Sequence, residues 1–404
     1  MLAMFLISPD EVTINESLES FLIRLCKANG FESYQTMALV IRDWLQDNDH
    51  EAAGSWPLTL SRANIYHANH SSGFRVRAFK LLDELLDTNS PSMLERCLLN
   101  TTTAFSPNLA SVSQRNIIIP LKFIRTSTIP VCPQCLTEHQ YIPQLWHISL
   151  YEACHHHKCE LITHCPSCNE QLNYLQAERI THCECGYDLR LINTIKAPTI
   201  NKVISEYIAG KDVDCLPLRA DMSERFGIIL WYQNRYLHSK HDDSSLIPFF
   251  EHWPQSFFEE LDDLSKTACD KQLKSFNKTD FSVVFGDVLA SCQKLPFRTP
   301  QQNIVLEAVL DYLISLVEKN PKCKMANLGD LQLNIIETAA LLSTSIEQVY
   351  RLIEEGYLQL AIKLKLHSRL SPNQGAFYLR QVIELRQSRI TPTYSNNMTY
   401  LPSW

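Results

Sequence analysis

The sequence contains little glycine, and this limits the functions it can carry. Its 404 residues include ten glycines, and no two of them lie close together. Loops of the GxGxxG and Walker types need clustered glycines at the start of a helix to cradle a nucleotide phosphate. No loop of these kinds can be written anywhere in the chain, and scarce glycine also favours helices over a β-rich architecture.

The sequence also lacks a basic excess and a long apolar run. Its 37 basic and 44 acidic side chains give a formal net charge of −7, whereas proteins that grip duplex DNA by themselves usually carry the opposite sign. No segment approaches the roughly 20 apolar residues of a membrane span. The start, "MLAMFLISPDE", has no positive charge before its apolar run, unlike a signal peptide. These features predict a cytoplasmic protein that does not bind membranes.

Cysteine, by contrast, is abundant and clustered. Fourteen cysteines in a reducing compartment predict metal sites wherever they gather. Two pairs have the CPxC form of a zinc knuckle, and each needs a second pair to complete a tetrahedron. Pairing in chain order predicts two structural Zn²⁺ sites. Their ligands are Cys132, Cys135, Cys154 and His157 in the first, and Cys165, Cys168, Cys183 and Cys185 in the second.

The fourth ligand of the first site has alternatives, because "CHHHKC" also offers His155, His156 and Cys159. We choose His157 since C-x-x-H repeats the spacing of a knuckle, whereas Cys159 requires a longer loop. The tight Cys183-Glu184-Cys185 spacing is followed by Gly186, which supplies backbone freedom. The remaining six cysteines are expected to be free buried thiols: Cys26, Cys97, Cys215, Cys269, Cys292 and Cys323.

Four protein ligands close each predicted site, and a catalytic zinc keeps one position open for water. The chain has no HExxH, and no PCxxC follows His182-Cys183-Glu184 as a deaminase would require. We therefore expect no catalysis. Residues 131–193 carry three basic and seven acidic side chains, and zinc-bound thiolates bring the charge of this module to about −7. Such a module repels phosphate and is better suited to binding protein.

Helical periodicity predicts a mainly α fold around this module. One helix is expected over 13–29, capped by Asn15, and a second from Ser33, together forming a candidate helix-turn-helix. The remaining predictions are helices over 74–86, 303–319, 337–342 and 346–355, and a wing-like strand over 357–366. The expected domains are an N-terminal helical domain with a helix-turn-helix (1–125), a tandem zinc-knuckle module (126–196), a helical domain (197–325), and a winged-like helix-turn-helix with its tail (326–404).

The C-terminal helix pair is the one place where nucleic acid is a candidate ligand. Residues 331–390 carry seven basic and five acidic side chains, a balance that permits contact with phosphate. Gln348 and Arg351 would face a major groove if the second helix docked conventionally. Lys363 and Lys365 would add phosphate contacts from the wing.

The zinc region resembles the TniQ/TnsD family, the target-selection proteins of bacterial transposons. The matching segments are "CPQC", "YIPQLWHISLYEAC", the C-x-x-H at Cys154–His157, "CPSC" and "CECGYDL", together with the opening "ESLESFLIRLCKANGF" and "EHWPQSFFEEL". The compact length is most similar to the TniQ of type I-F CRISPR-associated transposons. One departure is "HHHKC", where the family more usually shows C-P-x-H-G. The resemblance places the family's zinc ligands on the eight positions above.

The resemblance implies a non-catalytic adaptor, often a homodimer, that joins the RNA-guided Cascade complex and its guide RNA to the AAA+ regulator of the transposase. Target DNA would then be read mainly by base pairing with the guide. The alternative is a direct, sequence-specific DNA binder that uses the C-terminal helix-turn-helix, as in the longer members of the family. A zinc hydrolase or deaminase is a third and weaker alternative.

Overall fold

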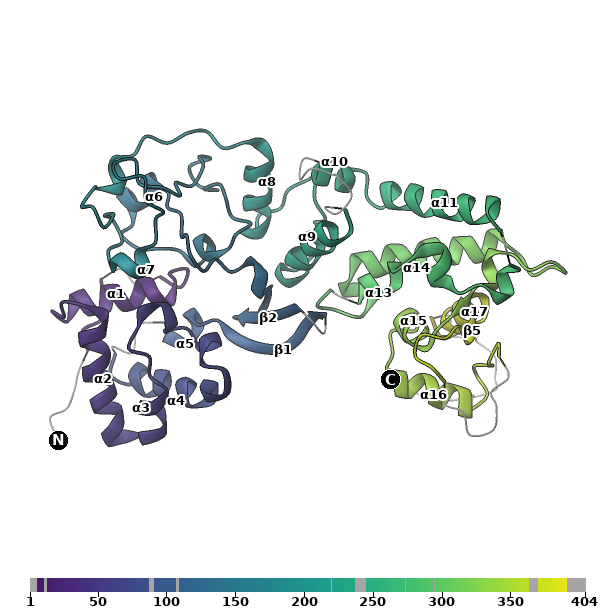
Figure 1. The fold of residues 1–404 in the computed structure, drawn as a ribbon, viewed down its shortest axis with the longest axis horizontal. Helices are drawn as coiled ribbons and strands as arrows, with labels where there is room; N and C mark the ends of the chain where they lie inside the picture. Colours follow the sequence, from purple (N-terminus) through teal and green to yellow (C-terminus); the bar gives the residue numbers. More distant parts are fainter. Residues whose placement is uncertain are drawn as a thin grey trace. The chain divides into compact units, whose positions relative to one another are not determined.

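The computed structural model describes residues 6–10, 13–86, 91–106, 109–218, 220–236, 245–272, 274–293, 295–362 and 370–390. The chain divides into two compact units, Met1–Val213 and Asp214–Trp404 (Figure 1). Both units are built mainly of helices, as predicted, whereas the division into four domains remains a prediction. Among the described residues, no helix has the length and apolar character needed to cross a membrane.

The first unit opens with a group of short helices. Ser17 precedes the first helix, and its Oγ accepts a hydrogen bond from the backbone of Ser20 at 3.2 Å. The predicted cap at Asn15 is therefore wrong, because the helix begins two residues later. Ser33 caps the second helix as predicted, and the turn before it contains Gly30 at φ 71°. The helices are α1 Leu18–Ala28, α2 Tyr34–Asn48, α3 His50–Ser55, α4 Ser72–Asp83 and α5 Met93–Arg96.

Buried leucine and aromatic side chains hold these helices together, and one buried arginine organises the loops between them. Trp56 and Phe79 meet edge to face at 5.2 Å between ring centroids. Arg75 lies on α4 and is 7% exposed. Its guanidinium donates to the backbone carbonyls of Ser55, Arg62 and Asn64 at 2.7–3.1 Å. A charge buried in this way is tolerated because carbonyl oxygens accept its hydrogen bonds.

A three-stranded antiparallel sheet follows, which the sequence analysis did not predict. Its strands are β1 Leu99–Ser106, β2 Leu109–Gln114 and β3 Ile117–Pro120, in the order β1-β2-β3. Gln114 pairs with Ile117 across a two-residue turn. Both turn residues, Arg115 and Asn116, have positive φ, at 47° and 67°, as expected of the turn type that suits a hairpin.

Residues 129–197 form the metal-binding part of the first unit and contain few regular elements. These are α6 Pro133–Glu138, α7 Tyr174–Ala177 and single 3₁₀ turns at Gln144–His147 and Leu189–Leu191. Isolated bridges, such as Val131 with Ile162 and Ala153 with Glu160, connect the loops. Helix α8, Thr199–Ile208, closes the unit. With so little secondary structure, we expect the cysteine and histidine clusters to stabilise the fold of this part together with buried side chains such as Trp146 and Tyr151.

The second unit is helical. Trp231 lies within ring contact of Trp253 and Phe257, which stack at 5.5 Å and 9°. Asn303 caps α14 through its side chain, so the helix predicted over 303–319 is confirmed. The helices are α9 Met222–Tyr236, α10 Leu246–Glu251, α11 Gln255–Asp270, α12 Phe281–Phe285, α13 Val288–Cys292 and α14 Ile304–Lys319.

The chain then forms the predicted helix pair, α15 Ile335–Leu341 and α16 Ile346–Glu354, with Ser345 as the cap of α16. Two short strands, β4 Gln332–Leu333 and β5 Phe377–Tyr378, pair before α17 Leu379–Ile390. The wing-like strand is wrong for residues 357–362, which form no strand, and 363–366 lie outside the described residues. Whether either helix pair acts as a DNA-binding helix-turn-helix remains a prediction.

Candidate metal centres

The structure brings the eight predicted donors together in two groups of four. In the first group, the donor atoms of Cys132, Cys135, Cys154 and His157 all lie within 4.8 Å of one another, and the same holds for the second group of Cys165, Cys168, Cys183 and Cys185. Zinc–sulfur bonds of 2.3 Å in a tetrahedron place sulfurs about 3.8 Å apart. The separations of 3.7 Å for Cys165–Cys185 and for Cys168–Cys183 are close to that edge.

The knuckle at Cys132 is built on the start of α6. Cys132 precedes the helix, Pro133 occupies its first turn, and the backbone of Leu136 donates to the Cys132 carbonyl at 3.0 Å. Proline fits there because its missing N–H would have no helical partner. The helix start therefore turns the Cys132 and Cys135 thiols toward one point.

Two other donor pairs share a different turn. In Cys154-x-x-His157, the backbone of Lys158 donates to the Cys154 carbonyl at 2.8 Å, and Lys158 has φ 57°. In Cys165-x-x-Cys168, Asn169 does the same to Cys165 at 2.8 Å with φ 59°. The first pair thus repeats the backbone geometry of a CxxC knuckle, which was the reason for choosing His157.

The last pair uses a tighter turn. Gly186 has φ 88°, and its backbone donates to the Cys183 carbonyl at 2.9 Å. The left-handed conformation suits glycine, as the sequence suggested. The sulfurs of Cys183 and Cys185 can therefore converge although one residue separates them.

His157 presents its Nδ1 to the thiols. This atom lies 3.5 Å from the sulfur of Cys132, 3.2 Å from that of Cys135 and 3.5 Å from that of Cys154. Its Nε2 lies 3.0 Å from a carboxylate oxygen of Glu138. A carboxylate behind an imidazole orients the ring and makes it a better metal ligand.

Electrostatics around His157 favour a cation at this point. Partial burial lowers the pKa of the ring, but the Glu138 carboxylate and the neighbouring cysteines outweigh it and raise the pKa to about 9. Without metal, a proton takes the place that a metal ion would fill. Metal binding must therefore release this proton along with those of the thiols.

Of the three alternative donors for the first group, His155 and His156 make other contacts or are exposed, and Cys159 lies close to the group. His155 Nδ1 lies 2.7 Å from the Tyr151 hydroxyl, and His156 is exposed. Cys159 is buried, with its sulfur 3.6 Å from that of Cys132. Of the six cysteines expected to be buried free thiols, Cys269 and Cys323 are instead exposed and Cys215 is half-buried.

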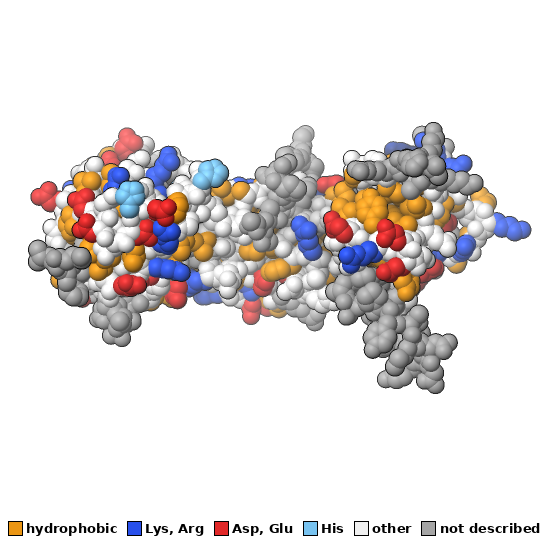
Figure 2. Space-filling model, turned by 90° about the horizontal axis from the view of Figure 1, so that it is seen from below, with side chains coloured by type: hydrophobic (Ala, Val, Ile, Leu, Met, Phe, Trp, Pro, Cys, Tyr) orange, Lys and Arg blue, Asp and Glu red, His pale blue; other side chains and the backbone are white. Residues whose placement is uncertain are grey.

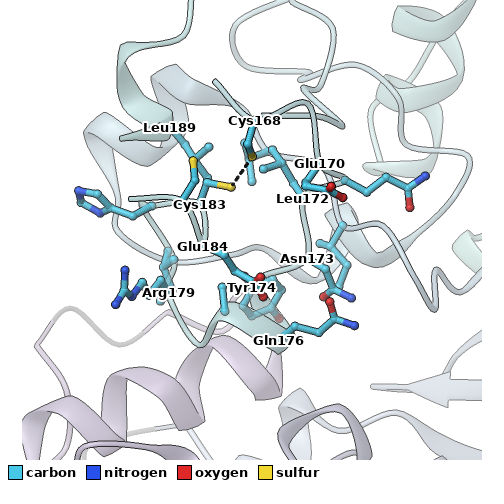
Figure 3. A pocket seen from close by; sticks show the side chains of 17 residues that line it. Cys168, Glu170, Leu172, Asn173, Tyr174, Gln176, Arg179, Cys183, Glu184 and Leu189 are labelled. Atoms are coloured by element: carbon cyan, nitrogen blue, oxygen red, sulfur yellow. Dashed lines mark hydrogen bonds between the residues drawn. The ribbon is translucent and has the colours of Figure 1, made fainter. Parts of the chain in front are cut away.

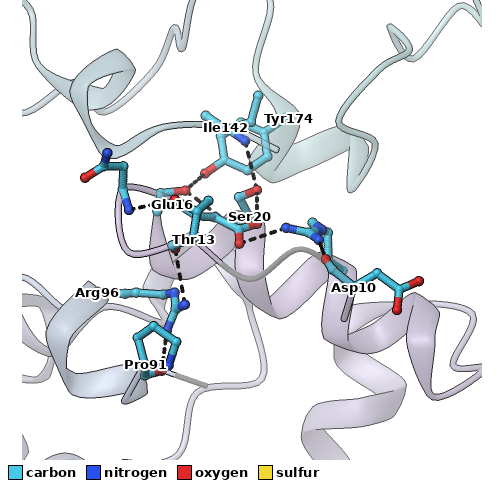
Figure 4. Close-up of polar contacts among 11 residues, drawn as sticks. Asp10, Thr13, Glu16, Ser20, Pro91, Arg96, Ile142 and Tyr174 are labelled. Atoms are coloured by element: carbon cyan, nitrogen blue, oxygen red, sulfur yellow. Dashed lines mark hydrogen bonds and ion pairs between the residues drawn. The ribbon is translucent and has the colours of Figure 1, made fainter. Parts of the chain in front are cut away.

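Buried hydrogen bonds join α1 to the metal-binding loops (Figure 4). The Ser20 hydroxyl donates to the Glu16 carboxylate at 2.8 Å and accepts from the backbone of Ile142 at 2.9 Å. The Tyr174 hydroxyl lies 2.9 Å from the Ser17 hydroxyl and 2.8 Å from His147 Nε2. These contacts span up to 157 residues of sequence and carry no local signal, so the sequence analysis missed them.

The same network contains two buried charges. Glu16 pairs with Arg24 at 3.0 Å, and burial raises the pKa of its carboxyl. Arg96 is fully buried, and its guanidinium donates to the carbonyls of Pro91 and Thr13 at 2.6 and 3.2 Å. The start of α1 is therefore fixed on both sides, to the loops of the metal-binding part and to the segment before β1.

An open pocket of about 400 Å³ lies beside the second group (Figure 3). Cys168 and Cys183 form part of its wall, and Leu172 and Leu189 contribute apolar surface. Its charged side chains are Glu170, Glu184 and Arg179. With a metal bound, four thiolates add a further net charge of about −2, so the pocket favours a positively charged group.

The predicted nucleic-acid residues are only partly placed. On α16, Arg351 is exposed and Gln348 is half-buried. Lys363 and Lys365 lie outside the described residues. The exposed side of α16 also carries Glu347 and Glu354, and the exposed Glu355 follows the helix directly.

The structure is that of a mainly helical protein with two neighbouring groups of four donors that could each hold a metal ion and that fit structural zinc. Residues 11–161 match the model of the TniQ family. The matched stretch runs from before α1 through the first group and ends before Cys165, and it indicates a protein of target selection in transposition. Among curated proteins, none matches this chain.

Proposed function

We propose that this protein is a non-catalytic adaptor in RNA-guided DNA transposition, which links a Cascade complex and its guide RNA to the AAA+ regulator of the transposase. The TniQ match supports a role in target selection, and the resemblance to the TniQ of type I-F CRISPR-associated transposons suggests the two partners. We further propose that the protein acts as a homodimer, which light scattering on the purified chain would test.

The observation that carries the proposal is the negative surface around the second donor group. Glu170 and Glu184 are exposed at a pocket whose wall includes Cys168 and Cys183 of the second donor group. Four donors per group leave no position for a substrate or an activated water. A rigid, acidic surface beside an open pocket suits a lysine or arginine side chain of a protein partner.

Among the residues that the structure describes, charge placement on the C-terminal helices argues against the alternative of direct DNA reading. The exposed side of α16 and the residue that follows it carry three glutamates and one arginine, Arg351. Two other basic residues of this segment are engaged inside the unit: Arg380 pairs with Asp330 at 3.2 Å, and Arg386 donates to the Leu341 carbonyl at 2.5 Å. On the face drawn in Figure 2, acidic and basic side chains are interspersed among the coloured residues.

Co-purification tests the proposal directly. The tagged full chain should capture Cascade with its guide RNA, and separately the AAA+ regulator, and failure with both would overturn the adaptor function. Charge reversal at the pocket, Glu170→Lys with Glu184→Lys, should weaken at least one capture tenfold or more, which corresponds to about 1.4 kcal/mol. The matched control is Glu318→Lys on α14, an exposed acid in the other unit.

DNA affinity separates the two functions. The isolated protein should bind random duplex weakly across a salt series. Tight binding with a steep salt dependence would instead establish the direct DNA binder, because each neutralised phosphate adds to the slope.

A further inference from the structure

The first donor group has a fifth candidate ligand. Cys159 is 3% exposed, and its sulfur lies 3.6 Å from that of Cys132. That separation is close to the roughly 3.8 Å edge of a zinc–thiolate tetrahedron. Cys159 is not one of the four donors that all lie within 4.8 Å of one another, a group whose fourth member is His157.

The backbone holds Cys159 in this position independently of the histidine. The backbone of Cys154 donates to the Cys159 carbonyl at 2.8 Å, and Cys159 forms a bridge with Lys196. Cys154 and Cys159 are thus the two ends of a tight turn, and His157 lies at its tip. Replacement of the ring would leave both ends in place.

His157 and Cys159 approach the same ligand. The His157 Nδ1 lies 3.5 Å from the Cys132 sulfur, and the Cys159 sulfur lies 3.6 Å from it. The His157 side chain is 17% exposed and contacts Glu138 at the surface, whereas Cys159 is buried. Imidazole can therefore supply a fourth donor from the surface, and a thiolate can supply it from the interior.

We propose that Cys159 is a reserve ligand of the first centre, which replaces His157 as the fourth donor when the imidazole is lost or when a more thiophilic ion is bound. The exchange converts a three-thiolate, one-imidazole site into a four-thiolate site. It adds one negative charge, since a thiolate replaces a neutral ring and the displaced thiol proton goes to solvent. This inference rests on the donor groups holding metal, and it is independent of the adaptor function.

Ion chemistry gives the exchange a direction. Zinc accepts either donor, whereas softer ions favour thiolate. A cadmium ion in the first centre should therefore draw in Cys159, and a zinc or cobalt ion should retain His157. The second centre, with four cysteines, is an internal reference for the four-thiolate state.

Cobalt substitution of the full chain provides the first test. The wild type should bind two ions per chain, one for each donor group, with the absorption of one three-thiolate and one four-thiolate site. His157→Ala should keep two ions and shift the first site to the four-thiolate spectrum. Cys159→Ser should keep two ions and the wild-type spectrum, and the double variant should keep one ion.

The proposal fails if His157→Ala alone loses an ion, or if Cys159→Ser alone does so, because Cys159 would then be either unused or the primary ligand. Fewer than two ions in the wild type would overturn the metal centres themselves.

A second test keeps His157 and so remains decisive if its variant does not fold. In cadmium-113 NMR spectra, the wild-type protein loaded with cadmium should give two signals in the four-thiolate region. Cys159→Ser should move one of them to the three-thiolate, one-nitrogen region. Identical spectra for the two proteins would refute the reserve role.

Discussion

Removal of both metal ions should unfold the metal-binding part of the first unit while the second unit stays folded. A structural zinc contributes roughly 10–16 kcal/mol in small zinc domains, and a whole domain is stable by about 5–15 kcal/mol. Residues 129–197 have little regular secondary structure to stabilise them, since α6 spans six residues and α7 four. The loss of both ions, about 20–32 kcal/mol on this scale, therefore exceeds what the remaining contacts of this part can offset.

Hydrogen exchange with mass spectrometry measures this effect by segment. After chelation, exchange should accelerate at least about a thousandfold, equivalent to roughly 4 kcal/mol, at backbone groups that close the knuckles. These are the N–H groups of Leu136, Lys158, Asn169 and Gly186. Helix α14 of the second unit serves as the internal control and should not change.

The first turn of α1 should respond as well, although it contains no metal ligand. The backbone of Ser17 donates to the Ile142 carbonyl at 2.9 Å, and that of Gln144 donates to Asn15 at 2.9 Å. Unfolding of the loops removes these contacts. If metal analysis shows both ions gone while the knuckle N–H groups keep their protection, the clusters do not hold the fold and the reasoning is refuted.

Three further predictions concern single side chains. In a denaturation assay, Tyr174→Phe should lower the free energy of unfolding of the metal-loaded protein by about 2–3 kcal/mol, because two buried hydrogen bonds lose their shared hydroxyl. The control is Tyr350→Phe, at a residue 40% exposed, which should change this free energy by less than about 0.5 kcal/mol. Burial raises the pKa of Glu224 to about 7, so the folded second unit holds a proton there that the unfolded chain releases, and the contribution of this carboxyl to stability should fall by at most about 3 kcal/mol as pH rises from 4.5 to beyond 7. Burial raises the pKa of Glu337 to about 7 as well, so Glu224→Gln should reduce the slope in urea titrations without abolishing it. Gly375→Ala should destabilise the protein by about 1–3 kcal/mol and lower its melting temperature, because the new Cβ would meet the Asp280 carboxylate and lie 2.8 Å from Gln332 Cβ. The control is Gly73→Ala in α4, where a Cβ meets nothing within 4 Å; it should leave the melting temperature unchanged or raise it.

The donor groups were predictable from sequence because metal geometry acts locally. The spacing of a CxxC pair predicts a tight turn that brings its own two donors together, and Gly186 supplies the left-handed residue that the closest pair, Cys183 and Cys185, requires. The strand pairing of β1 to β3 was missed although signals were present: Ile117, Ile118 and Ile119 are β-branched, and Arg115-Asn116 forms the turn. Helix periodicity elsewhere outweighed them.

Tertiary partners could not be predicted in the same way. Nothing near Ser17 in sequence indicates that its hydroxyl meets Tyr174, because the contact depends on how distant loops fold. His147 belongs to the same network, and burial lowers the pKa of its ring to about 3. The structure shows that it is a buried hydrogen-bonding residue of the joint between helix and loops.

The joint between α1 and the loops, made by the hydrogen bonds of Ser17 and Ser20 with Tyr174 and Ile142, determines how variants of the first unit must be interpreted. The region matched by the TniQ family contains both α1 and the first donor group, and buried hydrogen bonds connect them through Ser20 and Ile142. A substitution in α1 and the loss of a metal ligand should therefore disturb the same folded unit, and both would reduce partner capture even if neither side chain touched a partner. Substitutions of exposed charges at the pocket, such as Glu170 and Glu184, leave this joint intact. They can separate a docking surface from the fold that supports it.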